Sequence, residues 1–450
     1  MSFPRYPKYK DSGVEWIGQV PEHWTVTSLA RITNDRCDGP FGSGLKSDHY
    51  VDAGVRVIRL QNIRRYGFDD GDEAFIDETY FREQLSGHEV RAGDVLIAGL
   101  GDERNTVGRA CVAPDGIGPA MVKADCFRFR LNLRKALPQF VALQLTAGSV
   151  ADAGALSSGS TRARIPLSDM ASRKLALPPL SEQPWIVDFT VRALGKMNEL
   201  MTEQQRLMGL LKEKRQAVIS HAVTKGLNPH VPMKPSGIEW LGEVPAHWTV
   251  TLMKRAFRAM DYGISDALDS QGAIAILRMG NIEDGHVVLD DLKFTDDVDP
   301  ALLLQPGDLL YNRTNSLDLI GKVGLFPGVP DRQVSFASYL VRLRTEAESV
   351  PEYFAYLQNT EGILGLARSA AFVAIGQCNL NPSRYGQIEV AIPPKVEQAA
   401  IAAFLDREVA GIDALVAEAQ KTVDLLQERR TALISAAVTG QIDVRELAVS

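Results

Sequence analysis

Polar and basic side chains of the kinds that read DNA gather in a few loops of the sequence. Arg and Lys hydrogen-bond to guanine edges and to phosphates, whereas Asn and Gln hydrogen-bond to adenine. The candidates are Ser43, Lys46, Arg59, Asn62, Arg104, Asn105, Thr106, Arg162 and Arg164 in the first half of the chain, and Arg278, Asn281, Asn312, Arg313, Asn315, Gln377 and Asn379 in the second. Taken singly, each fits plain surface better than a contact. Their placement in corresponding loops of two similar regions is what points to DNA.

Catalytic signatures are missing from the sequence. It contains no GxxxxGK[ST] phosphate loop, no HExxH motif and no histidine at nucleophile–base spacing. The glycines of Gly39–Gly44 follow no clear strand, and Asn381–Tyr385 lacks one proline of the NPP-aromatic motif of amino-methyltransferases. Paired acids such as Asp69-Asp70 lie in polar loops and fit a solvated surface. These residues point to no enzyme.

Length and composition narrow the number of domains and the class of protein. A length of 450 residues predicts two or three domains, and 45% apolar residues is ordinary for soluble globular protein. Apolar runs are too short for a membrane span, and the N-terminal segment lacks a signal-peptide core. The four cysteines show no ligand spacing, so we expect reduced thiols and no metal in a cytoplasmic protein. The net charge of −7 decides little, because a local face can stay basic on an acidic chain.

A long helical pattern occurs twice and must position these loops. Residues Pro178–Gly226 align without a gap on Pro393–Gln441, at a fixed offset of 215 residues. A self-match of this length indicates a duplicated architecture. At ~1.5 Å per residue, about forty helical residues make a rod of roughly 60 Å. We therefore predict two long helices that pack against each other, antiparallel, and act as a spacer.

Heptad spacing of apolar residues supports the helical prediction. One row in the second copy consists of Leu405, Ile412, Ala419, Leu426 and Leu433. In the first copy Ile186, Ala193, Leu200 and Leu207 form a row with the same spacing. A neighbouring row in the first copy holds Met197, Leu211 and Val218, with Gln204 between them. Each Pro-Pro pair stands where a helix should begin. Because Pro184 is tolerable only in a first turn, the first helix should start later or bend.

A second repeated element precedes each variable region. Ser12–Thr27 returns as Ser236–Thr251, and four of the five tryptophans of the chain lie in these two connectors. We interpret the indoles as packing against a helix end, with ligand stacking as the alternative. The predicted layout is a connector at residues 1–24, a variable domain at 25–176 and a long helix at 177–226, followed by a connector at 227–248, a variable domain at 249–391 and a long helix with a tail at 392–450.

The two variable regions share landmarks although their loops differ. Val57–Ile63 resembles Ile276–Ile282, and Ala92–Ala110 resembles Pro306–Gly324. In the latter pair a Gly-Asp turn leads into an apolar strand and then into a polar loop. The fold class predicted is mixed α and β, with two α/β domains, two long antiparallel helices and a pseudo-twofold internal repeat.

The chain resembles the specificity subunits of type I restriction-modification systems. The residues that carry the resemblance are the two connectors, the stretch Gly39–Ile63, the two Gly-Asp strands and the starts and ends of both long helices. The resemblance covers nearly the whole chain in the order of the family. It implies two target recognition domains, each reading one half of a bipartite asymmetric DNA site, with the helices setting the gap.

The resemblance also implies the partners and the division of chemistry. In the family this subunit is non-catalytic, and it binds two methyltransferase subunits that carry S-adenosylmethionine and methylate adenine at N6. Restriction subunits add ATP- and Mg-dependent translocation and cleavage. Residues that match the helix motifs of the family, as spacer or partner contacts, are Glu182, Gln183, Leu211, Arg215, Glu397, Gln398, Leu426 and Arg430.

Three alternatives remain open on the sequence. A coiled-coil scaffold that binds only proteins would fit the net acidity. A methyltransferase in its own right would need motifs that the sequence lacks. A specificity subunit of a related bipartite methyltransferase–nuclease that is not type I would share every motif above, and its neighbouring genes would identify it.

Overall fold

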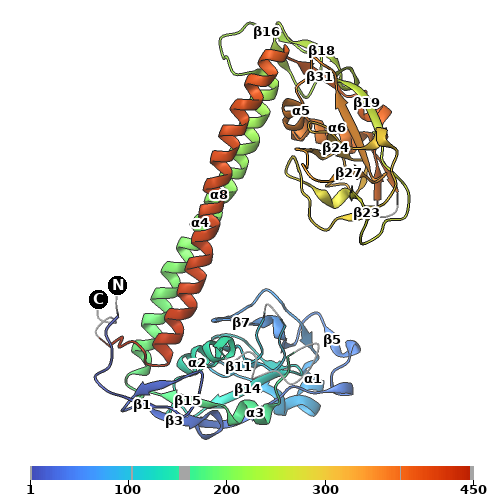
Figure 1. The fold of residues 1–450 in the computed structure, drawn as a ribbon. Coiled ribbons are helices and arrows are strands. Elements are labelled where there is room, and N and C mark those ends of the chain that lie inside the picture. The colour runs from blue at the N-terminus through green and yellow to red at the C-terminus, as the bar shows by residue number, and fades with distance from the viewer. Residues whose placement is uncertain (1–2, 103–104, 152–162, 375–376, 446–450) are drawn as a thin grey trace. The chain divides into compact units, whose positions relative to one another are not determined.

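The protein is described by a computed structural model that covers residues 3–102, 105–151, 163–374 and 377–445, without the side chains of Ser43 and Ala374. The chain forms two compact units (Figure 1). The first comprises residues 1–204 and 421–450, and the second comprises residues 205–420. Each unit holds one β-rich domain and a part of both long helices. The predicted fold class is confirmed.

The first unit contains fifteen strands and three short helices in its described part. They are β1 (Tyr9–Asp11), β2 (Gln19–Pro21), β3 (Thr25–Ser28), β4 (Thr33–Cys37), β5 (Tyr50–Val51), β6 (Val55–Ile58), β7 (Ile63–Arg64), β8 (Gly67–Phe68), β9 (Phe75–Ile76), β10 (Glu89–Val90), β11 (Val95–Ala98), β12 (Ala110–Val112), β13 (Ala120–Val122), β14 (Cys126–Leu131) and β15 (Lys174–Leu177), with α1 (Glu78–Tyr80), α2 (Pro138–Ala151) and α3 (Leu167–Ser172). A four-stranded antiparallel sheet has the order β12-β11-β14-β4. A five-stranded sheet has the order β10-β13-β6-β9-β5, in which β6 and β13 run parallel.

The second unit repeats this plan. Its strands are β16 (Met233–Pro235), β17 (Glu243–Pro245), β18 (Thr249–Leu252), β19 (Phe257–Tyr262), β20 (Ile274–Leu277), β21 (Ile282–Glu283), β22 (His286–Val287), β23 (Lys293–Thr295), β24 (Leu309–Asn312), β25 (Thr314–Asn315), β26 (Val323–Leu325), β27 (Gln333–Phe336), β28 (Leu340–Thr345), β29 (Phe372–Ala374), β30 (Gln377–Asn379) and β31 (Glu389–Ile392), and its short helices are α5 (Pro351–Gln358), α6 (Glu361–Ala370) and α7 (Pro382–Tyr385). The antiparallel order β19-β28-β24-β26 matches β4-β14-β11-β12. The parallel pair β20 and β27 matches β6 and β13. The two domains therefore share one topology.

The two long helices, α4 (Gln183–Lys225) and α8 (Lys395–Val438), pack side by side (Figure 1). In the first unit Arg430 Nη1 of α8 donates to Asn198 Oδ1 of α4 at 3.2 Å. In the second unit Arg215 of α4 forms an ion pair with Asp413 of α8 at 3.0 Å. The start of one helix thus lies beside the end of the other in each unit, so the pair is antiparallel as predicted.

The start of α4 and its buried row need separate comparison with the prediction. α4 begins at Gln183, whereas α8 begins directly after Pro394, and Pro184 stands in the first turn of α4, where a missing N–H costs little. The predicted row through Leu200 and Leu207 is wrong, because both side chains are exposed. Met197 and Met201 are buried in their place. The contact stripe thus follows the neighbouring row.

The repeated connectors close the helix ends. Trp24 is fully buried, and its indole Nε1 donates to Glu182 Oε1 at 3.3 Å. Trp248 is equally buried and donates to Glu397 Oε1 at 3.2 Å. At Gly440, after α8, the backbone has a φ of +74° and an added Cβ would meet Pro21, so only glycine fits there. The interpretation of the indoles as structural packing agrees with these contacts.

Candidate nucleic-acid interface

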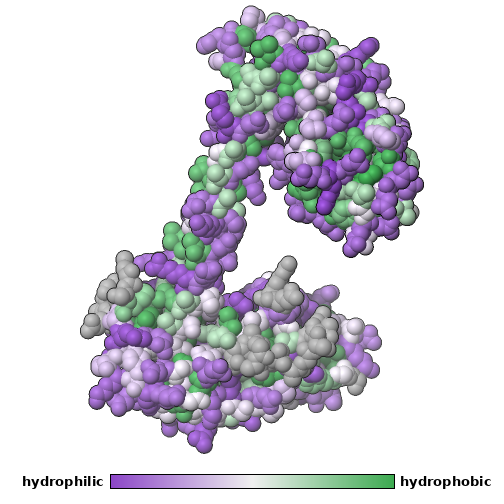
Figure 2. Space-filling view, in the orientation of Figure 1, coloured by the Kyte–Doolittle hydropathy of each residue, from purple (hydrophilic) through white to green (hydrophobic). Residues whose placement is uncertain are grey.

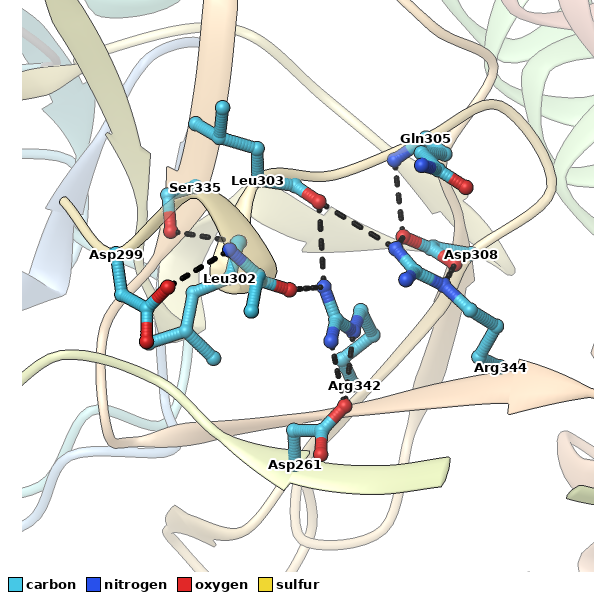
Figure 3. A network of polar contacts seen from close by, with 10 residues as sticks. Asp261, Asp299, Leu302, Leu303, Gln305, Asp308, Ser335, Arg342 and Arg344 are labelled. Carbon is cyan, nitrogen blue, oxygen red and sulfur yellow. Dashed lines mark hydrogen bonds and ion pairs between the residues drawn. The ribbon is translucent and has the colours of Figure 1, made fainter. Parts of the chain in front are cut away.

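A buried ion pair fixes the central strands of each domain. In the second domain Asp308 accepts from Arg344 through both carboxylate oxygens, at 2.8 Å each, and from the backbone N–H of Gln305 at 2.9 Å (Figure 3). In the first domain Asp94 and Arg130 repeat this two-bond pairing at 2.9 and 2.8 Å. Bidentate pairing is directional as well as strong. The Gly-Asp motif therefore sets the register of β24 on β28, and of β11 on β14.

A second arginine on the same strand extends this network. Arg342 is buried, and its guanidinium pairs with Asp261 of β19 at 2.5 Å (Figure 3). It also donates to the carbonyl oxygens of Ala301 and Leu303 at 2.9 and 3.2 Å. In the first domain Arg128 is equally buried and pairs with Asp35 of β4 at 2.6 Å, which lowers the pKa of that carboxyl. The network holds the loops at the sheet end in place.

Two of the candidate amides make hydrogen bonds within their own loops. Asn281 is buried, accepts from the N–H of Arg278 at 2.8 Å, and donates to the carbonyls of Val288 and Asp290 at 3.1 and 2.7 Å. Asn62 makes the same three bonds within its loop at 2.8 Å each. A side-chain amide has one acceptor oxygen and two N–H donors. These bonds therefore leave each side chain little hydrogen-bonding capacity for a DNA base.

The preceding arginines are also engaged. Arg59 forms an ion pair with Asp72, and Arg278 pairs with Asp291 at 2.8 Å. These pairs are partly exposed, so a phosphate could compete for either guanidinium. Asn312 lies buried on β24. Because its side chain is buried in the sheet, it cannot contact DNA at the surface.

We expect Asn281→Asp to lower the free energy of unfolding by about 1–3 kcal/mol, because the new carboxylate would face two carbonyl oxygens. Urea denaturation of the full chain measures this loss. Asn315→Asp is the matched control, since the Asn315 oxygen only accepts from the N–H of Ser316, which a carboxylate does as well. Weaker DNA binding by Asn281→Asp with unchanged stability would contradict the structural role.

The remaining candidates of the second domain meet on one small sheet. The order of this sheet is β25-β30-β29, and it pairs Asn315 with Cys378 and Thr314 with Asn379. The amide of Asn379 donates to Thr314 Oγ1 at 3.2 Å, and Gln377 is exposed. The structure thus brings Asn315, Gln377 and Asn379 together at the end of β24.

Arg313 joins this group from the single residue between β24 and β25. Its Nη1 donates to the carbonyl of Ser338 at 2.9 Å, and its guanidinium lies 4.9 Å from the centroid of the exposed Tyr262 ring. Phe372 and Val373 of β29 are exposed as well. We call the surface made by Arg313, Asn315, Gln377 and Asn379 the second candidate reading face.

The first domain carries Arg164 at the matching place. The N–H of Ile165 donates to Gly99 O at 2.9 Å just after β11, as the N–H of Leu380 donates to Arg313 O at 2.8 Å just after β24. Arg164 and Asn379 are the residues before these two. Arg164 is exposed, and its equivalent in the second domain is the amide side chain of Asn379.

Acidic and aromatic side chains surround Arg164. Its Nε donates to Asp125 Oδ1 at 2.9 Å, and its guanidinium lies 5.3 Å from the centroid of the exposed Phe41 ring. A hollow of about 390 Å³ beside it is lined by Asp38. Burial raises the pKa of Asp38 to about 6, and the charge of Asp125 adds to the rise. We call this surface around Arg164 the first candidate reading face.

The other candidates of the first domain have separate surroundings or lie outside the described residues. Lys46 is exposed, Asn105 bonds to Asp102, and the hydroxyl of Thr106 lies 2.9 Å from that of Ser149. Arg104, Arg162 and the side chain of Ser43 lie outside the part of the chain that the structure describes. The exposed rings of Phe41 and Tyr262 give no signal in the sequence, because a single aromatic residue belongs to no polar motif.

The helix-motif residues join domain to helix within each unit. Glu182 accepts from the hydroxyl of Tyr6 and lies 2.9 Å from His23, while Glu397 lies 2.7 Å from His247. Gln183 and Gln398 accept from the N–H groups of Leu137 and Val350 at 2.6 and 2.8 Å, which orders the chain before α2 and α5. Leu211 and Leu426 are half-buried, and Arg215 and Arg430 make the cross-helix contacts given above.

Neither a metal site nor a membrane span is found in the described parts. No group of three or more His, Cys, Asp or Glu side chains there is arranged to hold a metal ion. No helix within them has the length and apolar character needed to cross a bilayer.

Known proteins resemble the chain over nearly its full length. No family model matches it. The specificity subunit of the type I restriction enzyme EcoKI from Escherichia coli K12 is 22% identical, covering 94% of this chain and 90% of that protein. The putative type I restriction enzyme MjaX specificity subunit from Methanocaldococcus jannaschii is 21% identical, with coverages of 95% and 96%.

Solved structures share the fold. A chain from a study of complex assembly and conformational transition of the type I R-M system matches with a TM-score of 0.70 at 15% identity, covering 93% of this chain and 98% of its own. The HsdS subunit from Thermoanaerobacter tengcongensis matches with a TM-score of 0.54 at 15% identity, with coverages of 94% and 98%. The full-length matches and the shared fold identify the chain, by distant homology, as one of the specificity (HsdS) subunits of type I restriction-modification systems, which are non-catalytic subunits.

Proposed function

We propose that this chain recognises a bipartite DNA sequence and directs N6-adenine methylation and restriction by partner subunits to it, each domain reading one half-site. The observation that carries the proposal is one scaffold built twice with different side chains at one position. Arg164 in the first domain and Asn379 in the second occupy equivalent positions, because the next residue of each donates its N–H to the residue that follows β11 or β24. Arg favours guanine and Asn favours adenine in direct readout. Two such faces suit two different half-sites.

Within this proposal the candidate reading faces contribute base contacts, and other basic residues contribute phosphate contacts. Arg313, Asn315, Gln377 and Asn379 carry the second half-site, and Arg164 carries the first. Lys46, Arg59 and Arg278 suit phosphates, which supply affinity without sequence choice. Asn62, Asn281 and Asn312 make no base contact in this proposal, because their side chains are buried.

We expect Arg313→Ala to relax specificity at one half-site only, with a cost of about 1–3 kcal/mol for the correct base. Arg164→Ala is the reciprocal variant and should relax the other half-site. The measurement is methylation of a library in which each position of the site is randomised. Equal relaxation of both half-sites by either variant would contradict separate recognition.

The proposed partners are double-stranded DNA, two methyltransferase subunits and restriction subunits, in the cytoplasm. Exposed leucines recur on the helices at the offset of the repeat. Leu200 and Leu425 are 53% and 55% exposed in the first unit, and Leu415 and Leu210 are 57% and 54% exposed in the second. Apolar patches along the helices are visible in Figure 2. Two equivalent apolar sites fit two copies of one partner. S-adenosylmethionine, ATP and Mg are assigned to the partners.

A protein scaffold without DNA binding is the second candidate, and the net charge of −7 favours it. The salt dependence of binding separates the two. A DNA-binding chain loses affinity steeply with salt, with a logarithmic slope near −0.9 per phosphate neutralised. A chain whose complex with the methyltransferase shows no such slope would be a scaffold. A methyltransferase–nuclease outside type I remains a variant of the main proposal, and the neighbouring genes decide it.

A further inference from the structure

A tyrosine links the first domain to a long helix. Tyr66 lies in the turn between β7 and β8, and the guanidinium of Arg430 on α8 lies 4.9 Å from the centroid of its ring. Burial raises the pKa of Tyr66, whereas Arg430, Arg65 and the neighbouring Thr431 side chain act in the opposite direction. The ring therefore occupies a space bounded by Arg430 and Thr431.

The second domain has the same turn without the ring. β21 and β22 pair Glu283 with His286, as β7 and β8 pair Arg64 with Gly67, so Gly285 takes the place of Tyr66. Both positions have a positive φ, +89° at Gly285 and +68° at Tyr66. The repeat offset maps the helix residues as well, so that Arg215 and Gln216 stand for Arg430 and Thr431.

A cavity of about 180 Å³ lies at this place in the second unit. Its lining includes Gly285 from the turn, Arg215, Gln216 and Ile219 from α4, and Tyr356 from α5. A cavity on the order of 150 Å³ is large enough for benzene. Charged side chains such as Lys322, Glu352 and Asp406 also line this one, so it suits a ring that carries a polar group. The cavity has room for a ring, and Arg215 and Gln216 border it as Arg430 and Thr431 border the ring of Tyr66.

We propose that this cavity is a binding site for a phenol-type aromatic ring, which stacks on Arg215 and hydrogen-bonds to Gln216. A planar cation over a ring face is favourable by about 0.5–2 kcal/mol, more when water is excluded. The ring belongs either to a free small molecule or to a tyrosine side chain of a bound subunit. Its chemistry is the same in both cases.

The test uses p-cresol, which is the tyrosine side chain as a free molecule. Ile219 lines the cavity, so its methyl resonance reports binding in the full-length chain labelled at isoleucine methyl groups. We expect a saturable shift of the Ile219 resonance in wild type and its loss in Gly285→Tyr. An added Cβ at Gly285 meets only Asn359 Nδ2, at 3.6 Å, so the new side chain can enter the cavity. Gly285→Ala is the control that changes the turn but leaves the cavity open.

The first unit supplies a reciprocal variant that does not depend on the folding of Gly285→Tyr. Tyr66→Gly opens the matching space, and Ile434, the counterpart of Ile219, should then report a second p-cresol site. The number of bound p-cresol molecules should rise from one to two per chain. Absence of any Ile219 shift in wild type, or an undiminished shift in Gly285→Tyr, would overturn the proposal.

A further arm distinguishes the two sources of the ring, and it alone rests on the proposed methyltransferase partner. If the partner excludes p-cresol from the complex and shifts Ile219 by itself, the ring is a side chain of the partner. If p-cresol binds equally to the complex, the ligand is a free aromatic molecule. DNA binding is not needed for either readout, so failure here is separate from failure of the proposed function.

Discussion

Removal of one heptad from each long helix should abolish methylation at the original site and create methylation at a site with a shorter gap. The deletion takes out residues 201–207 and 421–427, which lie between the Asn198–Arg430 and Arg215–Asp413 contacts. Seven residues span ~10 Å, the length of about three base pairs at ~3.4 Å each. The helix face changes by only ~20° per heptad, so the packing stripe is kept.

The size of this effect follows from the loss of one half-site. Specific binding exceeds non-specific binding by about 4–10 kcal/mol, so binding through a single half-site forfeits about 2–5 kcal/mol. The new gap should be shorter by up to about three base pairs, because the twist of the DNA must be matched as well as its length. Gln205→Ala, an exposed substitution in the same heptad, keeps the length and should keep the site. An unchanged gap in the deleted protein would refute the spacer role.

Asp308→Ala should destabilise the second domain by about 3–5 kcal/mol, because it leaves the charge of Arg344 without its partner inside the protein. The side chain of Asp308 is 3% exposed and that of Arg344 is 19% exposed. The N–H of Gln305 loses its acceptor as well. Hydrogen exchange resolved by peptide measures the loss, since it reports each domain separately.

The first domain provides the matched variant. Asp94→Ala breaks the equivalent pair with Arg130 and should give a similar loss confined to the first domain. Asp318→Ala, at an exposed position of the second domain, should change stability by less than about 0.5 kcal/mol. If Asp308→Ala loosened both domains equally, the ion pair would not be a local determinant of the sheet.

The sequence predicts those parts of the fold that depend on local pattern and on duplication. The long helices follow from apolar periodicity, and the Gly-Asp strands follow from a turn signal before an apolar run. Leu200 shows what apolar periodicity does not predict, namely the face through which a helix packs. Its heptad spacing is correct for a helix, but which of two neighbouring rows faces the partner depends on how the two helices pack. A single helix does not specify that choice.

Burial separates the candidate amides in a way that the sequence does not. Asn281 and Asn379 have the same side chain, yet Asn281 bonds to its own loop and Asn379 lies on a small sheet. The small sheet joins residues that are about 60 positions apart, so no local pattern reveals it. The role of Gly285 likewise emerges only beside Tyr66 in the other unit.

Genome-wide mapping of N6-methyladenine in cells that co-express this chain with its methyltransferase subunit tests the central claim most directly. We expect a bipartite motif with a fixed unspecified gap, which disappears when this chain is omitted. Arg313→Ala should then broaden one half of that motif and Arg164→Ala the other. A stable complex that adds no new methylation would contradict the account and would favour a protein scaffold.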